Sequence, residues 1–259
     1  MRHVLQAPHR MMFFIGAGNV LLAMAWWAAW LVSARWPGVL HLGQPSQYAG
    51  WLHAIVMQYQ VLASFVFGFL LTTFPKWMGL PELRRARYLP VGIGVFGGQI
   101  CTLFGALGWS KGIEVGLVLT ISGWAWGVGT LAWLVVSEKG ATWHARSCLA
   151  ALVLGLVGLF AWAAFVAGGS AMWAFVAIKL GTFGFLLPVY LTVAHRMFPF
   201  FAGNTVPGYK PWRPMWVLGV GFALLLLHLA FELVHAYAWA WIADLPLFAL
   251  TAYLCWRWW

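Results

Sequence analysis

Three ionisable side chains stand close together near the end of one apolar run: His228, Glu232 and His235. On a helix, positions i, i+4 and i+7 fall within about 60° of one another, so these side chains are expected to share one face. Imidazole suits haem iron or copper, and a nearby carboxylate can orient a ligand histidine through its second nitrogen. The spacing therefore predicts a metal or haem site. The alternative is a polar face that bonds neighbouring helices or meets water.

A second candidate ligand set, His53 and Met57, lies earlier in the chain, and Gln60 and Ser64 continue the same helical face. His53 and Met57 together offer ligands to copper, and either residue offers an axial ligand to haem. Methionine at helical spacing is more often a packing residue, so that alternative stays open for Met57. His41, in the preceding loop, is a less direct candidate.

Lys179 lies inside another apolar run. An ammonium group within a membrane needs a partner, and Glu232 is expected at a similar depth. A Lys179–Glu232 ion pair is therefore the structural alternative to a role for Glu232 beside a metal ligand.

Three more histidines, His9, His144 and His195, lie at the opposite ends of apolar runs. A histidine at the boundary between membrane and water is usually solvated or caps a helix. We expect this for His144 and leave the roles of His9 and His195 open. Pro188 is expected to kink the run that ends near His195, because proline has no amide hydrogen and frees a carbonyl group.

The composition decides what kind of protein must position these residues. Of the 259 residues, 63% are hydrophobic and only 8% are charged, whereas soluble domains are about a quarter charged. The chain is therefore expected to be an integral membrane protein with the lipid bilayer as its main partner. Nucleic-acid binding, a soluble nucleotide-dependent enzyme and a disulfide scaffold are disfavoured. The three cysteines are far apart and are expected to be small buried apolar residues.

About 20 mostly apolar residues are needed to cross a bilayer as a helix. The fold class is therefore all-α, a single transmembrane bundle over residues 1–259. Glycines spaced four apart, such as Gly94 with Gly98 and Gly112 with Gly116, predict close packing of the third and fourth spans. About eight spans are expected: Met12–Ala34, Gly50–Phe74, Leu89–Trp109, Gly112–Val136, Ser147–Ala167, Ala171–Met197, Met215–Ala236 and Trp239–Trp258.

The basic residues predict the orientation of these spans, because short cytoplasmic loops are enriched in Lys and Arg. Only Arg35 and Lys111 lie on one side, and Lys179 lies within a span. Both termini are therefore expected in the cytoplasm, which also supports an even number of spans. Twelve basic residues lie on the other side: Arg2, Arg10, Lys76, Arg84, Arg85, Arg87, Lys139, Arg146, Arg196, Lys210, Arg213 and Arg257.

Several segments form a distinctive set: Ala7–Phe14, Trp51–Ala54, Phe67–Trp77 (FGFLLTTFPKW) and Ala194–Phe201, followed by Asn204 and Pro207–Tyr209. Together they resemble the NnrS family of bacterial polytopic membrane proteins. The resemblance implies haem b and/or copper as cofactors, a link to nitric oxide metabolism and nitrosative stress, and a bacterial inner-membrane location. It draws attention to His9, His53 and His195 as motif positions. Members of this family are usually longer, so we expect either a compact variant or part of a longer chain.

Three functions are compatible with the sequence. The first is a haem- or copper-binding inner-membrane protein that senses, binds or relieves nitric oxide. The second is a non-catalytic subunit of a larger respiratory or photosynthetic complex, with neighbouring subunits or a second copy as contacts. The third is a small-solute transporter that uses Lys179 and Glu232, although the sequence has no paired broken-helix pattern of the usual kind. No nucleophile constellation, phosphate loop or nucleotide fingerprint is evident, so no reaction is predicted.

Overall fold

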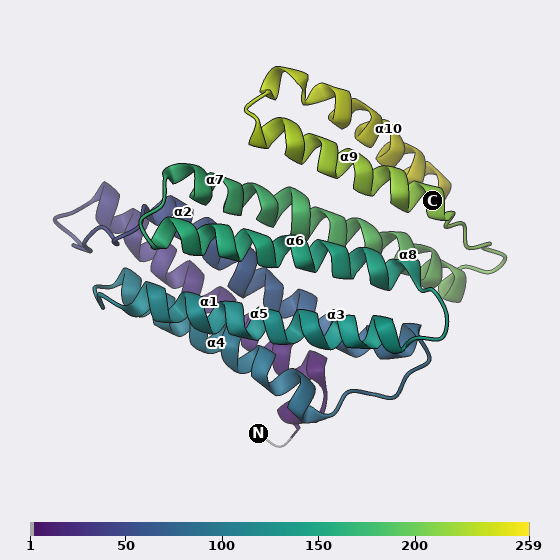
Figure 1. Cartoon of the computed structure of the whole chain (residues 1–259), viewed down its shortest axis with the longest axis horizontal. Coiled ribbons are helices and arrows are strands. Elements are labelled where there is room, and N and C mark those ends of the chain that lie inside the picture. Colours follow the sequence, from purple (N-terminus) through teal and green to yellow (C-terminus); the bar gives the residue numbers. More distant parts are fainter. Residues whose placement is uncertain (1–2, 259) are drawn as a thin grey trace. The chain divides into compact units, whose positions relative to one another are not determined.

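A computed structural model of the chain describes residues 3–258, and this part is helical with no β-strand (Figure 1). Eight of its helices are long and apolar enough to cross a membrane. Within a bilayer, backbone amide and carbonyl groups must be paired inside the segment, and an apolar helix achieves this. The expected all-α membrane fold with eight spans is confirmed, including the eighth span, which the structure places at Tyr237–Trp258.

Six spans are single helices or nearly so, and their bounds lie within a few residues of those expected. A short helix, η1 (Val4–Gln6), precedes the first span and another, η4 (Tyr237–Trp239), precedes the last. The six helices are α1 (Pro8–Arg35), α4 (Arg85–Ala106), α5 (Gly112–Ser137), α6 (Trp143–Val166), α9 (Met215–Leu233) and α10 (Trp241–Trp258).

The other two spans are each interrupted by a π-helical segment. The second span consists of α2 (Ala49–Val56), η2 (Met57–Leu62) and α3 (Ala63–Trp77). The sixth consists of α7 (Ala171–Lys179), η3 (Leu180–Leu186) and α8 (Leu187–Thr205). Pro188 lies at the start of α8, so the regular helix is interrupted just before the proline, where an amide hydrogen is missing. Such segments change which residues face a neighbouring helix, and they are frequent at functional sites.

The chain divides into two compact units. The first comprises Met1–Gly140 and Leu156–Ile178. In it α1 packs on α3 and α4, and α4 packs on α5. The carbonyl groups of η2 are bonded by side chains: Trp124 donates to the Tyr59 carbonyl (2.8 Å), and Asn19 and Ser64 donate to the Gln60 carbonyl (3.4 and 2.7 Å). These bonds fix the π-helical segment in the unit's interior.

Close contact between α4 and α5 follows from their glycines. A Cβ atom on Gly94 would lie 2.5 Å from the Gly123 Cα atom, and one on Gly98 would lie 2.8 Å from the Gly116 carbonyl oxygen. Larger residues would separate the two backbones. The close packing expected of the third and fourth spans is confirmed.

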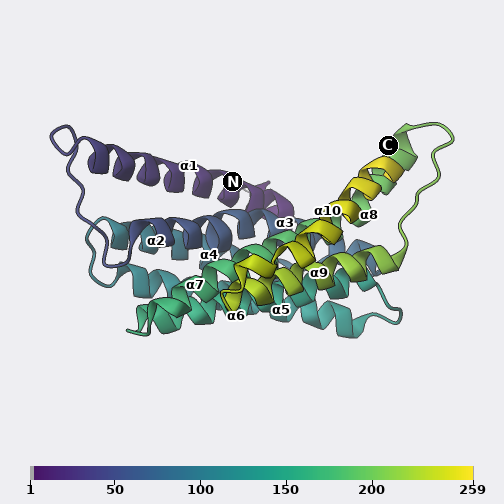
Figure 2. The ribbon, with the colours of Figure 1, turned by 90° about the horizontal axis from the view of Figure 1, so that it is seen from above.

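The second unit comprises Ala141–Gly155 and Lys179–Trp259. Its helices α9 and α10 form an antiparallel pair that runs side by side in Figures 1 and 2. Leu191 of α8 packs with Leu218 and Leu225 of α9. Val217, also of α9, packs with Leu250 and Leu254 of α10. These contacts join α9 to both α8 and α10.

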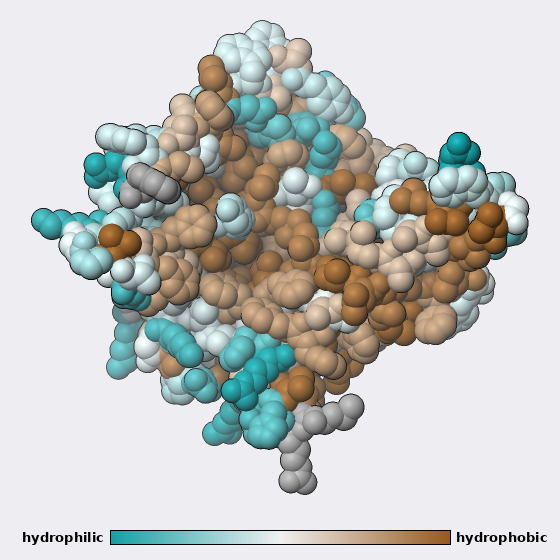
Figure 3. Space-filling view, turned by 180° about the vertical axis from the view of Figure 1, so that it is seen from behind, coloured by the Kyte–Doolittle hydropathy of each residue, from teal (hydrophilic) through white to brown (hydrophobic). Residues whose placement is uncertain are grey.

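Large apolar side chains remain exposed along the outer faces of the helices. Figure 3 shows one face, where apolar residues cover broad areas and hydrophilic residues gather nearer the edges. Exposed apolar surface of this extent is suited to lipid. The orientation of the termini and the assignment of the chain to a single domain stay predictions.

Candidate functional site

A cluster of four ionisable side chains lies in the second unit. His228 and Glu232 occupy one face of α9, Lys179 ends α7, and Asp244 lies in the first turn of α10. The Lys179 Nζ atom lies 2.9 Å from Glu232 Oε2, and His228 Nδ1 lies 2.6 Å from Asp244 Oδ1. Three separate helical segments therefore bring their charged groups to one place.

The two nitrogens of His228 have different roles. An ionised carboxylate only accepts hydrogen bonds, so Nδ1 must carry the hydrogen that it donates to Asp244. In the neutral ring Nε2 then holds a lone pair. This atom is buried, makes no hydrogen bond with the described residues, and lies 3.5 Å from Glu232 Oε1. Asp244 thus fixes the tautomer and orientation of His228, as carboxylates that bond a ligand histidine do in metal sites.

The expected Lys179–Glu232 ion pair is confirmed. The side chains of Lys179 and Glu232 are only 25% and 13% exposed, so water screens the pair less than it would on a surface. With neutral His228, the cluster holds one cation and two carboxylates. The remaining negative charge favours a bound cation near His228 Nε2.

The π-helical segment η3 contributes a wall to this cluster. Its Phe183 ring lies 4.0 Å, centroid to centroid, from the His228 ring, and Lys179 Nζ lies 5.8 Å from the same Phe183 centroid. The His228 side chain is 12% exposed and Asp244 is 50% exposed. The cluster therefore has an apolar inner wall and one carboxylate that reaches the surface.

His235 does not share the helix face expected of it, and that part of the prediction is wrong. Helix α9 ends at Leu233, and His235 follows in the left-handed region with a φ of 56°. The Ala236 amide turns back to the Phe231 carbonyl at 2.8 Å, which closes the helix end. The exposed His235 ring meets the Tyr237 hydroxyl instead. A role for His235 as a ligand stays a prediction.

His53 and Met57 lie in the first unit, and their expected ligand role stays a prediction. The His53 ring stacks on Trp27 of α1, with ring centroids 4.2 Å apart and planes within 12°. Its Nδ1 atom is buried and makes no hydrogen bond with the described residues. Met57, half-buried, begins η2, so the π-helical segment interrupts the regular spacing from His53 to Gln60 and Ser64.

His195 and His144 form a buried pair in the second unit. His195 Nε2 lies 3.1 Å from the Pro214 carbonyl oxygen, which only accepts, so Nε2 donates. Nδ1 of the neutral ring then accepts from His144 Nε2 at 3.0 Å. Both nitrogens of His195 are used, and metal ligation by His195 would have to displace one of these bonds. The expectation that His144 is solvated or capping is wrong, because its side chain is buried against His195.

His9 lies near the start of α1 in the first unit. Its amide donates to the Thr72 hydroxyl at 3.1 Å, and its ring Nδ1 lies 3.3 Å from the same oxygen. The Thr72 hydroxyl itself donates to the Gly68 carbonyl at 2.8 Å, so the His9 Nδ1 is the donor to Thr72. In the structure His9 joins α1 to α3, and its predicted role as a ligand is neither supported nor opposed by these bonds.

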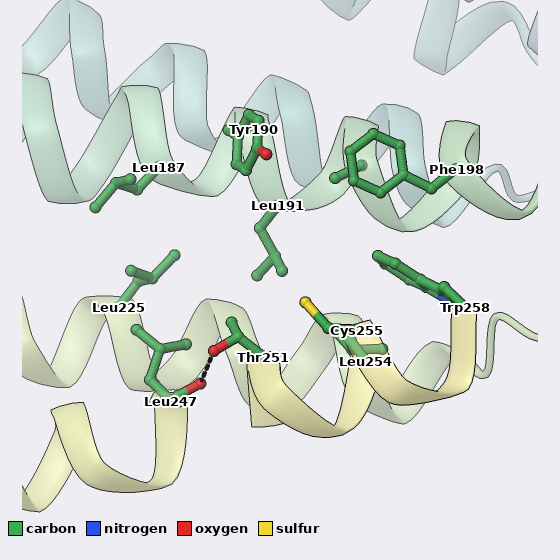
Figure 4. A pocket seen from close by; sticks show the side chains of 11 residues that line it. Leu187, Tyr190, Leu191, Phe198, Leu225, Leu247, Thr251, Leu254, Cys255 and Trp258 are labelled. Carbon is green, nitrogen blue, oxygen red and sulfur yellow. Dashed lines mark hydrogen bonds between the residues drawn. The ribbon is translucent and has the colours of Figure 1, made fainter. Parts of the chain in front are cut away.

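An apolar groove of about 610 Å³ lies between α8 and the α9–α10 pair (Figure 4). Its volume is in the range of small-molecule sites, about 300–1,000 Å³. Leu191, Leu225 and Leu247 point into it (Figure 4). Its polar side chains are Tyr190, Thr251 and Cys255. No histidine lines this groove, so its donors do not fit a haem held by imidazole.

The donors that do fit a metal are the unbonded nitrogens of His228 and His53. Among residues 3–258, no group of three or more His, Cys, Asp or Glu side chains is arranged to hold a metal ion. His228 has the more complete surroundings, with an orienting carboxylate, a second carboxylate oxygen 3.5 Å away and excess negative charge. By donor chemistry this cluster fits an imidazole-ligated metal.

Sequence reasoning missed Asp244 and the partner of His144. Asp244 lies inside the expected eighth span, Trp239–Trp258. An acid inside an apolar segment needs a partner, which is the signal that pointed to Glu232 and could have pointed here. For His144 no comparable signal exists, because the contact depends on how α6 packs on α8.

A family model described as NnrS protein matches residues 3–259, nearly the whole chain. No match was found among curated proteins, and none among solved structures.

Proposed function

Because this chain belongs to the NnrS family, we propose that it is a haem- or copper-binding protein of the bacterial inner membrane that binds, senses or relieves nitric oxide. The family is linked to nitric oxide metabolism, and the eight apolar helices make the chain a multi-pass membrane protein. The cofactor, its ligands and the inner-membrane location are the proposed part.

The observation that carries the proposal is the state of His228. Its Nδ1 is held by Asp244 at 2.6 Å, and its Nε2 is buried with no hydrogen bond to the described residues. A buried imidazole nitrogen with a lone pair is a donor suited to haem iron and to copper. Glu232 Oε1, 3.5 Å from that nitrogen, is the second candidate ligand to a copper ion.

His53 is the candidate ligand of the first unit. The Trp27 ring holds it by stacking, and its unbonded Nδ1 is available. His228 and His53 would each bind through one nitrogen, and Asp244 and Trp27 would keep the rings in place. When bound, the metal supplies an open coordination position for nitric oxide.

The test is the visible spectrum and metal content of the whole chain, purified in mild detergent after expression with haem and copper supplied. We expect a Soret band, or copper in stoichiometric amount. The His228→Ala variant should lose or shift that signal, and His53→Ala should do so if both histidines are ligands. Addition of nitric oxide to the reduced protein should change the spectrum.

His3→Ala is the matched control, because His3 is exposed ahead of the first span and is not a candidate ligand. It should keep the wild-type spectrum and metal content. A wild-type preparation that is colourless and metal-free would overturn the proposal. A signal that survives in both His228→Ala and His53→Ala would place the cofactor elsewhere.

A further inference from the structure

A network of uncharged polar side chains fills the interior of the first unit. Four membrane-spanning segments contribute to it, and every member is less than 5% exposed. None of the members is ionisable, so the network belongs to neither histidine site. Its members are Asn19 of α1, Gln60 of η2, Ser64 of α3, Gln99 and Thr102 of α4, and Thr120 of α5.

The bonding partners fix which way the Gln60 amide points. Its Nε2 lies 3.2 Å from Thr102 Oγ1 and 2.9 Å from Thr120 Oγ1. Each threonine hydroxyl already donates its hydrogen to a carbonyl of its own helix, at Gly98 and Gly116 (both 2.8 Å). Both hydroxyls can therefore only accept from Gln60. If the Gln60 amide were flipped, its Oε1 would face the two threonine hydroxyls, whose hydrogens are already donated elsewhere.

The same reasoning fixes the other two amides. Gln99 Nε2 lies 2.7 Å from the backbone carbonyl oxygen of Asn19, and Asn19 Nδ2 lies 3.4 Å from the backbone carbonyl oxygen of Gln60. Carbonyl oxygens only accept, so the NH₂ groups must point there. All three side-chain NH₂ groups therefore donate hydrogen bonds within the network.

Their oxygens are left without donors. Asn19 Oδ1, Gln60 Oε1 and Gln99 Oε1 are buried and receive no hydrogen bond from any described residue. A buried acceptor without a donor is unfavourable, and most such groups in proteins bind ordered water. Three in one network indicate that something outside the chain supplies the hydrogens.

We infer that this network binds one internal water molecule, which donates a hydrogen bond to Gln60 Oε1. A cavity of about 10 Å³ lies beside Gln60, Thr102 and Thr120, and its other walls are apolar. About 10–15 Å³ is the space that one water molecule requires. The cavity excludes any larger ligand.

A monovalent cation is the competing occupant, and the charges disfavour it. No acidic residue belongs to the network, and the chain carries a formal charge of +10. A cation here would be an uncompensated charge within the membrane, which is costly. Water brings hydrogens without charge.

The glycines of α4 and α5 give the network its shape. A Cβ on Gly98 would collide with the Thr120 hydroxyl, and one on Gly116 with the Thr102 hydroxyl. Close approach of the two backbones thus brings both hydroxyls to Gln60. The π-helical segment η2 places Gln60 opposite them.

The test is a density map of the whole wild-type chain in lipid, at a resolution that shows ordered water. We expect a peak about 2.5–3.0 Å from Gln60 Oε1, the distance of an O–H···O bond. The peak should be lost in Gln60→Met, which keeps the length of the side chain without its amide. Gln44→Met, at an exposed loop position, should keep it.

Data collected after replacing monovalent cations with thallium(I) separate water from a cation. Water gives no anomalous peak in the cavity. An anomalous peak there would overturn the inference in favour of a cation site, and an empty wild-type cavity would overturn it outright. Because both readouts use the wild type, a variant that fails to fold does not remove the test.

Discussion

At the scale of single residues, the two ring nitrogens of His228 stand in different environments. One nitrogen is tightly held by Asp244, and the other is enclosed but unbonded. The neutral ring offers a ligand, whereas a doubly protonated ring would stand between two carboxylates. A metal ion at Nε2 therefore requires the neutral ring, with its hydrogen on Nδ1.

The role of Asp244 can be separated from that of the ligand itself. The Asp244→Asn substitution keeps the shape but replaces a charged acceptor with a weaker, neutral one. Removing a carboxylate that orients a ligand histidine typically lowers metal affinity about 10–100-fold. We expect that loss in the Kd for copper or haem, measured by competition with a chelator or with apomyoglobin.

The control for Asp244→Asn is Glu82→Gln, which removes an exposed carboxylate outside the spans. Its Kd should equal that of the wild type. Equal affinities of Asp244→Asn and wild type would show that Asp244 does not orient the ligand.

The Lys179–Glu232 pair predicts a charge-reversal effect. Lys179→Glu and Glu232→Lys should each lower stability by about 1–3 kcal/mol, less than the 3–5 kcal/mol of a fully buried pair because Lys179 is partly exposed. The double variant should recover part of the loss, limited by the new ammonium group beside His228. Thermal unfolding in detergent measures this.

The exposed pair Lys111–Glu114, 3.1 Å apart and 69% and 53% exposed, is the control. Its single and double reversals should change stability by less than about 1 kcal/mol. If the Lys179–Glu232 double variant is no better than either single variant, the two charges are not coupled.

The sequence predicted partners correctly where the free-energy cost of an unpaired charge within the membrane was decisive. A lysine and a glutamate inside apolar runs need each other, which identified Lys179 and Glu232. Asp244 and His144 were not assigned partners because their contacts depend on the register of α10 on α9 and of α8 on α6. Helix α9 ends where His235 adopts the left-handed backbone conformation. Glycine usually marks such a helix end, and here the sequence has none.

At the scale of elements, α4 and α5 show how small residues specify a helix pair. Contact at Gly94, Gly98, Gly116 and Gly123 brings the backbones together and carries the threonine hydroxyls into the interior. Without a hydrophobic driving force in lipid, such packing is a main source of helix association. The pair is therefore expected to be sensitive to single added methyl groups.

Two neighbouring glycines of α4 test this directly. Gly98→Ala places a methyl group against the Thr120 hydroxyl and should destabilise by about 1–3 kcal/mol. Gly97→Ala meets only a Leu119 methyl at 3.6 Å and should be neutral or stabilise by up to about 1 kcal/mol. Unfolding midpoints of the two variants give the comparison. Equal midpoints would contradict backbone contact at Gly98.

The extent of the spans could be predicted, whereas only one of their two interruptions was marked in the sequence. Hydropathy fixes where a helix must cross, because unpaired backbone groups are not tolerated in lipid. The π-helical segments η2 and η3 depend on partners elsewhere, such as Trp124, which bonds the Tyr59 carbonyl. Pro188 marked one interruption, and nothing in Met57–Leu62 marked the other.

At the scale of the whole molecule, the first four spans and the last four share a plan. Each set begins with a helix that carries a histidine near its start. His9 of α1 bonds Thr72 of α3, and His144 of α6 bonds His195 of α8, in the second half of the next span in each case. In each set that next span contains a π-helical segment. The repeated FGFLL at residues 67–71 and 183–187 is offset relative to these segments.

The orientation of the whole chain rests on twelve basic residues on one side against two on the other. Because short basic loops are retained in the cytoplasm, the loop that contains Gly43 is expected in the periplasm and both termini in the cytoplasm. Alkaline phosphatase, which is active only in the periplasm, should be active when inserted after Gly43 and inactive when fused to the C-terminus. A C-terminal green fluorescent protein should fluoresce. The reverse pattern would place the His228 cluster, and with it the proposed metal, at the cytoplasmic instead of the periplasmic end of α9.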